Sequence, residues 1–130
     1  MDRYNLEDRL IDFSVLVIEI ARGISNSLTG RHLSGQIIRS GTSVSLNYGE
    51  AQSGESRKDF IHKMKVVLKE LRETHICLKI IHRVKLSKSE EMILKAERES
   101  NELIAIFVKS IETAQKNIEQ QKRNKSQFNS

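Results

Sequence analysis

The sequence predicts a single all-α domain, an antiparallel up-down-up-down four-helix bundle, and three observations lead to this fold class. The 130 residues include no proline and only six glycines, so long helices meet few of the residues that break them. Along four segments, apolar residues recur mainly at alternating spacings of three and four, which is the period of near-parallel helix packing. Short polar stretches separate these segments, and short connections between helices give antiparallel neighbours.

The first helix is expected over about residues 5–27 and the second over about residues 32–51. The apolar row of the first consists of Leu6, Leu10, Phe13, Val17, Ile20 and Ile24. The row of the second consists of Leu33, Ile37, Val44 and Tyr48, completed by Gly41. Between the two helices, Gly30 can supply a left-handed cap. The second helix is rich in glycine and serine, which are poor helix formers, so packing against a close neighbour must stabilise it.

The third helix is expected over about residues 56–85, after a loop at residues 52–56. Its apolar row consists of Phe60, Met64, Val67, Leu71, Leu78 and Ile81. Ser87 and Glu90 match a capping box, which predicts the start of a fourth helix that runs to about residue 121. We therefore place the bundle domain at residues 1–121. Residues 122–130 form a polar tail without periodicity, which we expect to be frayed.

Composition limits the class of protein. Hydrophobic residues make up 38% and charged residues 30%, enough for one core under a charged surface. No apolar run approaches the roughly 18–20 residues that a membrane span needs, and the polar residues 1–5 argue against a signal peptide. The single cysteine, Cys77, excludes an internal disulfide. We expect a cytoplasmic protein without a membrane partner.

Two of the expected helices carry more apolar residues than one core can use. In the first, Ile11, Val15 and Ile18 lie opposite the core row. In the third, Val66, Ile76, Ile80 and Val84 lie well away from it. A helix that is apolar on two sides is usually buried on two sides, which predicts self-association. The alternative is a wide core stripe with scattered exposed aliphatic residues, which are common on protein surfaces.

Enzyme chemistry has no support in the sequence, and we expect no catalytic residue, metal site or cofactor. The four histidines are His32, His62, His75 and His82, and no two of them have the spacing with which a helix holds a metal ion. Glycine-rich phosphate-binding loops are absent. Serines occur near histidines in the sequence, but a nucleophile and its base must meet in space, and no local pattern indicates that they do.

A polar row accompanies the apolar row of the second helix, and two acidic residues of the third helix are candidate partners for its arginine. The row consists of Gln36, Arg39, Ser43, Asn47 and Glu50, and the acidic residues are Glu70 and Glu73. We interpret these seven residues as a hydrogen-bonded network that sets how the two helices align, since buried polar groups need partners. The alternative is a site for a ligand or a protein partner.

The positive charge is concentrated on the third helix. The net charge of the chain is +5, and residues 57–85 hold nine basic and three acidic side chains. Six of the basic residues recur at helical spacing and form one row about 38 Å long. This row, the basic stripe, consists of Lys58, Lys65, Lys69, Arg72, Lys79 and Arg83. It could follow the phosphates of RNA or DNA. The alternative is a solvated helix face, and no aromatic residues interleave with the stripe to stack on bases.

Residues 36–51, QIIRSGTSVSLNYGEA, resemble the signature of the small four helix bundle protein family, also described as proteins encoded by intervening sequences in 23S rRNA genes. The similarity extends over about residues 8–118 and includes residues 56–60 and 68–74. It implies a four-helix bundle that assembles as a ring-like homopentamer. It also implies distant kinship with the accessory protein of diversity-generating retroelements, a basic pentamer that binds a reverse transcriptase and nucleic acid. Many members continue with glycine and a basic residue where this chain has Ala51 and Gln52.

These observations lead to two hypotheses about function. The first is a non-enzymatic, homo-oligomeric binding or scaffold protein that engages RNA or DNA weakly through the basic stripe. The second is a protein-binding adaptor, for example for a polymerase-like partner, without nucleic-acid contact. Salt separates them, because phosphate contacts weaken steeply as salt rises and an apolar protein interface does not.

Overall fold

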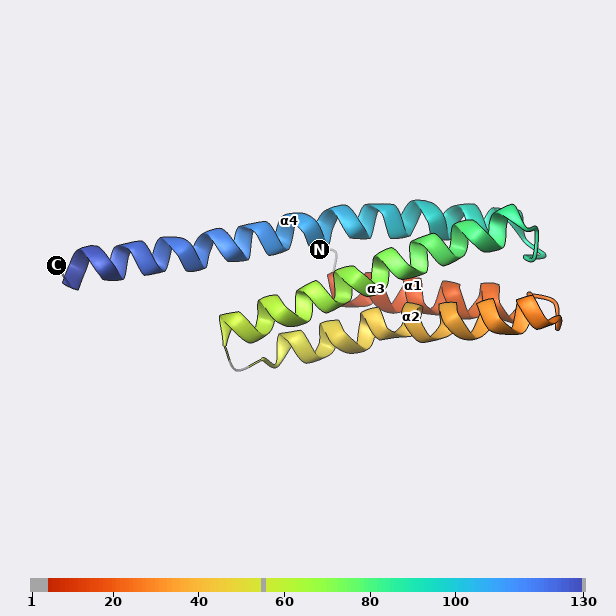
Figure 1. The fold of residues 1–130 in the computed structure, drawn as a ribbon, viewed down its shortest axis with the longest axis horizontal. Coiled ribbons are helices and arrows are strands. Elements are labelled where there is room, and N and C mark those ends of the chain that lie inside the picture. Colours follow the sequence, from red (N-terminus) through yellow and green to blue (C-terminus); the bar gives the residue numbers. More distant parts are fainter. Residues whose placement is uncertain (1–4, 55, 130) are drawn as a thin grey trace.

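The computed structural model describes residues 5–54 and 56–129, with the side chains of residues 128 and 129 excepted, and contains four helices there. They are α1 (Leu6–Arg22), α2 (Leu28–Gln52), α3 (Arg57–Arg83) and α4 (Glu90–Asn129). Each helix packs against the next, and α1 packs against α4, so that α1 and α3 occupy opposite corners (Figure 1). The predicted four-helix bundle is confirmed. No helix in the described ranges is long and apolar enough to cross a membrane.

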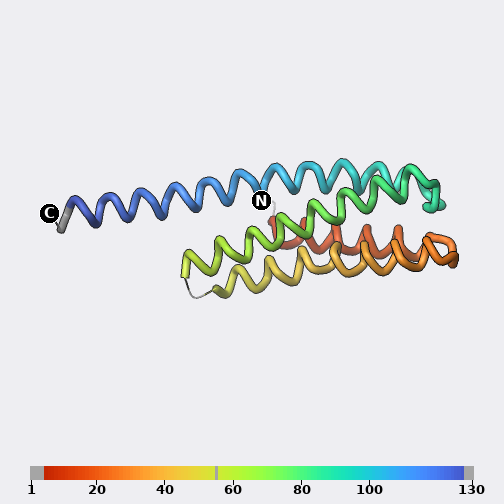
Figure 2. The backbone as a smooth tube through the Cα atoms, in the orientation of Figure 1, coloured from red at the N-terminus to blue at the C-terminus, as the bar shows by residue number. Residues whose placement is uncertain are grey.

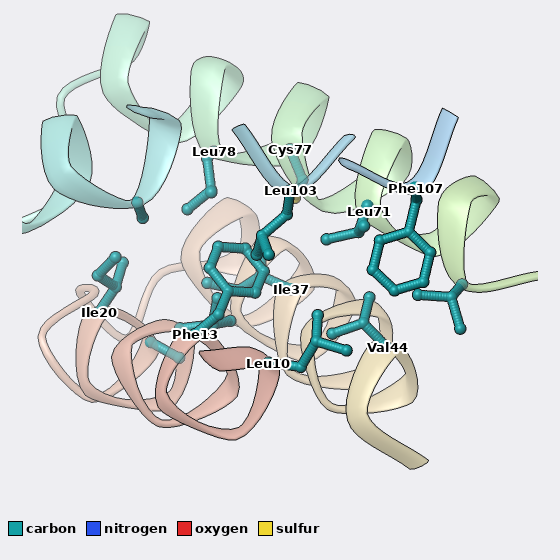
Figure 3. Close-up of a cluster of buried hydrophobic side chains, with 14 of the residues drawn as sticks. Leu10, Phe13, Ile20, Ile37, Val44, Leu71, Cys77, Leu78, Leu103 and Phe107 are labelled. Carbon is teal, nitrogen blue, oxygen red and sulfur yellow. The ribbon is translucent and has the colours of Figure 1, made fainter. Parts of the chain in front are cut away.

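The core contains the apolar rows that the sequence predicts. Figure 3 shows side chains of all four helices meeting there, among them Phe13 of α1, Ile37 of α2, Leu71 of α3 and Leu103 of α4. At one end, the rings of Tyr48 and Phe107 meet edge to face, with centroids 5.8 Å apart. The periodicity that predicted the helices therefore also identified their buried sides.

Serine and asparagine side chains cap the N-termini of the helices. Asn5, Ser27 and Ser56 each accept a hydrogen bond from the backbone N–H three residues ahead, at 2.9–3.1 Å. In α4 this role belongs to Ser89, whose Oγ accepts from the N–H of Met92 at 3.2 Å. The capping box predicted at Ser87 and Glu90 is therefore wrong, because α4 begins two residues after the start that the box implies.

The connection between α1 and α2 also differs from the prediction. Helix α1 ends at Arg22, and α2 begins at Leu28, before the expected start at His32. Gly30 has no positive φ and does not cap α1. It lies in the first turn of α2, where an added Cβ would stand 2.0 Å from the carbonyl oxygen of Ser25. This glycine is required by close packing rather than by a left-handed backbone.

Helix α4 continues to Asn129, beyond the end predicted near Gln121. Residues 122–129 contain no glycine or proline, so the polar tail has no residue that stops a helix. Figure 2 shows this end of α4 running past the other three helices. Residues 119–127 are exposed. The first four residues, whose polarity argued against a signal peptide, and the last residue of the predicted tail lie outside the described residues.

Helix α2 approaches α1 closely at Gly41. An added Cβ there would stand 2.7 Å from Cγ1 of Val17, a fully buried side chain of α1. On the same side, the Oγ of Ser14 donates a hydrogen bond to the carbonyl oxygen of Gly41 at 2.7 Å. Toward α3, the Oγ1 of Thr74 donates to the Oγ of Ser40 at 2.8 Å. The small residues of α2 thus allow both neighbours to approach, as their abundance predicted.

We predict opposite effects for two glycine substitutions in α2. Gly41→Ala should lower the free energy of unfolding by about 1–3 kcal/mol, because Val17 is β-branched and cannot easily move aside. Gly35→Ala should raise it by about 0.5–1 kcal/mol, since alanine favours helix and no atom lies within 4 Å of the new Cβ. Urea unfolding measures both values, and equal effects of the two substitutions would contradict the close approach.

Helix α3 ends in a left-handed residue that is not glycine. Lys85 has φ 56°, and its N–H donates to the carbonyl oxygen of His82 at 3.1 Å. The N–H of Leu86 donates to the carbonyl oxygen of Ile81 at 3.1 Å. These two bonds form a Schellman motif, in which glycine is the usual residue at the left-handed position.

We predict that Lys85→Gly stabilises the protein by about 1 kcal/mol, because glycine adopts this conformation without steric cost. The matched control is Lys69→Gly, an exposed lysine inside α3, which should destabilise by about 1 kcal/mol. Melting temperatures should therefore move in opposite directions. A fall in melting temperature for both variants would refute this account of the α3 end.

Candidate nucleic-acid interface

All six residues of the basic stripe are exposed on α3, on the side away from Leu71 and Leu78 of the core. None of them forms an ion pair or hydrogen bond with another described residue. Lys63, which lies outside the stripe, instead pairs with Glu50 of α2 at 3.1 Å. The stripe residues therefore keep their charges available to solvent.

A shallow groove lies beside the middle of the stripe, between α3 and α4. Its volume is about 500 Å³. Three stripe residues line it, together with apolar and acidic side chains from both helices. The lining residues are Lys65, Leu68, Lys69, Arg72, Val108, Ile111 and Glu112. Sequence periodicity identified the three cations, whereas the groove depends on how α4 sits beside α3.

The arginine of the polar row meets both of its predicted partners. The guanidinium of Arg39 lies 3.2 Å from Oε2 of Glu70 and also forms an ion pair with Glu73. The Glu70 side chain is 12% exposed, whereas that of Arg39 is 51% exposed. The interaction therefore joins α2 to α3 at the surface of the bundle, with one carboxylate partly withdrawn from water.

The other members of the polar row do not form one continuous network with Arg39. Asn47 donates to both the carbonyl oxygen and the Oγ of Ser43, at 3.0 and 2.8 Å. Glu50 pairs with Lys63 of α3. The backbone carbonyl oxygen of Gln36 accepts a hydrogen bond from the Oγ of Ser40 at 3.0 Å. The polar row therefore divides into separate local contacts. Those of Arg39 and Glu50 join α2 to α3, and the others lie within α2.

Two polar clusters between helices were not predicted from the sequence. The hydroxyls of Ser14 and Ser45 lie 2.6 Å apart between α1 and α2. Arg9 of α1 holds Glu99 of α4 through two hydrogen bonds of 2.8 Å and reaches Glu102 at 3.0 Å. Its hydrogen bonds lower the pKa of Glu99, against the opposing effect of burial. The three-residue spacing of Glu99 and Glu102 was the available signal for this cluster.

Two histidines of α3 face α4. The Oγ of Ser100 lies 2.7 Å from Nδ1 of His75 and 3.0 Å from the carbonyl oxygen of Glu97, and the tautomer of the ring decides which group donates in the first contact. Burial, followed by Lys79, lowers the pKa of His75, while Glu97 opposes the shift. Ser100 is fully buried, and its contact with His75 joins α3 to α4. His82 lies 2.9 Å from the carboxylate of Glu97.

The fold and these positions can be compared with known proteins. A family model described as 23S rRNA-intervening sequence protein matches residues 5–109. The chain belongs to this family. The match includes residues 36–51, which carry the resemblance noted above, and all six residues of the basic stripe. No curated protein matches the chain.

A solved structure is similar to this member of the 23S rRNA-intervening sequence protein family. It is the crystal structure of a protein of unknown function from the S23 ribosomal protein family of Bacteroides thetaiotaomicron. The TM-score is 0.75 and the sequence identity 30%, covering 82% of this chain and 98% of the other. The family match ends at Lys109, so the second half of α4 lies beyond it.

We predict that Arg39→Ala lowers the free energy of unfolding by about 1–2 kcal/mol, because it leaves the partly buried carboxylate of Glu70 unpaired. The loss of a fully buried arginine would cost about 3–5 kcal/mol. The half-exposed guanidinium in the structure lowers the expected value. Arg22→Ala, which removes an exposed pair within α1, should change stability by less than about 0.5 kcal/mol. Equal losses in urea unfolding would exclude a special role for Arg39.

Proposed function

We propose that this family member is a non-enzymatic, self-associating scaffold that binds RNA or DNA weakly through the basic stripe of α3. The observation that carries the proposal is the stripe itself. Six exposed cations follow one helix without a carboxylate partner among the described residues. An ion pair within the protein would have to break before such a cation could meet a phosphate, and no described residue forms one with these six.

The chemistry of the stripe suits the phosphate backbone. Lysine and arginine neutralise phosphates and release condensed counterions, so binding weakens steeply as salt rises. The stripe spans about 38 Å, close to one turn of a duplex. Because it has no interleaved aromatic residue, it would contact phosphates without stacking on bases. The proposal is therefore for binding with little sequence preference.

Self-association is the second part of the proposal and rests on exposed aliphatic side chains. Ile11 and Val15 of α1 and Ile76, Ile80 and Val84 of α3 remain exposed in the single chain. Such residues tend to be covered by another protein surface when they gather on one face. Association would also repeat the basic stripe, and linked weak sites bind a polymer more tightly than one site alone.

A protein partner is the second candidate, favoured by the groove beside the stripe. Its apolar floor, formed by Leu68, Val108 and Ile111, lies next to three cations. An acidic amphipathic helix fits this chemistry, with apolar residues on the floor and carboxylates toward the lysines. The polymerase-like partner implied by the resemblance would bind here without touching nucleic acid.

We predict that the purified protein binds a fluorescent oligonucleotide at low salt, and that changing Lys65, Lys69 and Arg72 together to glutamine abolishes binding. Each cation removed singly should reduce the salt slope by about one unit. The matched control changes Lys122, Arg123 and Lys125 near the end of α4 to glutamine. It removes the same charge from exposed positions and should retain most of the binding.

Fluorescence anisotropy across a salt series measures both variants, with melting curves as a check of folding. Equal losses in the two variants would indicate general charge attraction instead of a site on α3. If the wild-type protein does not bind at low salt, the nucleic-acid proposal fails and the protein-partner candidate takes its place.

A further inference from the structure

A second groove lies at the end of the bundle where α1 begins. Figure 1 shows α2, α3 and α4 continuing past the first turn of α1, which starts at Leu6. The groove has a volume of about 820 Å³ and lies between the start of α3 and the middle of α4. We call it the corner groove. It is lined by Arg57 and Phe60 of α3 and by seven residues of α4 between Ala105 and Asn117.

The side of α4 that lines the corner groove continues the side that packs against α1. Arg9 of α1 contacts Glu99 and Glu102 of α4. The same helical row continues at spacings of three and four with Ile106, Lys109, Thr113 and Asn117. Because α1 and α4 run in opposite directions, these four residues lie toward and beyond the start of α1 (Figure 1). The groove therefore extends a surface on which one helix already packs.

The lining of the corner groove suits the packing of another helix. Phe60 and Ile106 are only partly buried and provide its largest apolar side chains. Ala105, Ser110 and Thr113 are small, so a helix backbone can approach α4 closely between them. The distance along α4 from Ile106 to Asn117 is about 16 Å, which corresponds to about three helical turns. A short amphipathic helix matches this length and this lining.

The charges at the corner groove select an acidic occupant. The side chains of Arg57 and Lys109 are exposed at the groove and form no ion pair or hydrogen bond with another described residue. Among the described lining residues there is no acidic side chain. The exposed end of α4 in a second copy is basic and would bring like charges together. The complementary occupant is therefore a helix with carboxylates, from a different protein.

We propose that the corner groove binds an acidic amphipathic helix of a protein partner. The apolar side of this helix packs on Phe60 and Ile106, and its carboxylates pair with Arg57 and Lys109. It lies in line with α1 and fills the corner of the bundle that α1 leaves open, as in other complexes where a helix occupies a groove. The corner groove is separate from the basic stripe and from the groove beside it, so this inference does not depend on nucleic-acid binding or on self-association.

The test uses the full chain and a fluorescein-labelled synthetic peptide of about 14 residues, long enough for the groove. The peptide carries leucines along one helical face and glutamates on both flanks. Fluorescence anisotropy should show that it binds. Replacing the leucines by serine, or the glutamates by lysine, should weaken binding by about tenfold or more, since each change removes one of the two complementary features.

Two charge-reversal variants locate the site. Arg57→Glu with Lys109→Glu should lose the glutamate peptide and gain the lysine peptide, because the groove then carries the opposite charge. The matched control is Lys65→Glu with Lys69→Glu, which makes the same change of charge in the groove beside the basic stripe. It should retain the glutamate peptide. All four positions are exposed, and circular dichroism checks that both variants are folded.

Four outcomes would overturn the proposal. The first is a wild-type protein that does not bind the glutamate peptide at low salt. The second is a control variant that loses binding as strongly as the corner-groove variant, which would indicate general charge attraction or the other groove. The third is full binding of the serine peptide, which would exclude an apolar contact. The fourth is binding that weakens as the protein concentration rises, which would mean that a second copy occupies the groove.

Discussion

The close contact of α2 with its two neighbours at Ser40 and Gly41 is the constraint on which the rest of the bundle depends. A side chain at position 41 would collide with Val17, and the carbonyl oxygen of Gly41 accepts the hydroxyl of Ser14. On the other side, Ser40 meets Thr74 of α3. Apolar packing tolerates some sliding of one helix along another, but directional hydrogen bonds at such close contacts do not. These contacts therefore fix which turn of α1 and which turn of α3 lie beside each turn of α2.

How much could be predicted from the sequence depended on whether a feature belongs to one helix or to two. The buried rows and the exposed basic stripe follow from the helical period alone, so Leu10, Leu71 and Lys69 lie where the spacing placed them. The pairing of Arg39 with Glu70 also followed, because α2 and α3 are neighbours in the chain. The contact between Ser14 and Ser45 and the cluster around Arg9 needed the relative positions of two helices, which periodicity does not contain.

Helix boundaries were harder to predict because several polar residues compete for each cap. Ser87 and Ser89 both precede α4, and the backbone determines which hydroxyl reaches the N–H groups of the first turn. Gly30 is a residue type that is common at helix ends, yet it lies inside α2. Lys85 is the opposite case, a helix end without glycine. Lysine does not favour φ 56°, but the hydrogen bonds of the Schellman motif require this conformation.

The C-terminal turns of α4 extend beyond the bundle, so the length of this helix does not depend on how the four helices pack. Its last turns, residues 119–127, expose their side chains, so their helicity depends on the local helix–coil equilibrium. Such turns open and close without disturbing the core, and they add little to its cooperative unfolding. Evolution can therefore lengthen this segment, shorten it or fuse another module to it while every buried contact of the four helices stays unchanged.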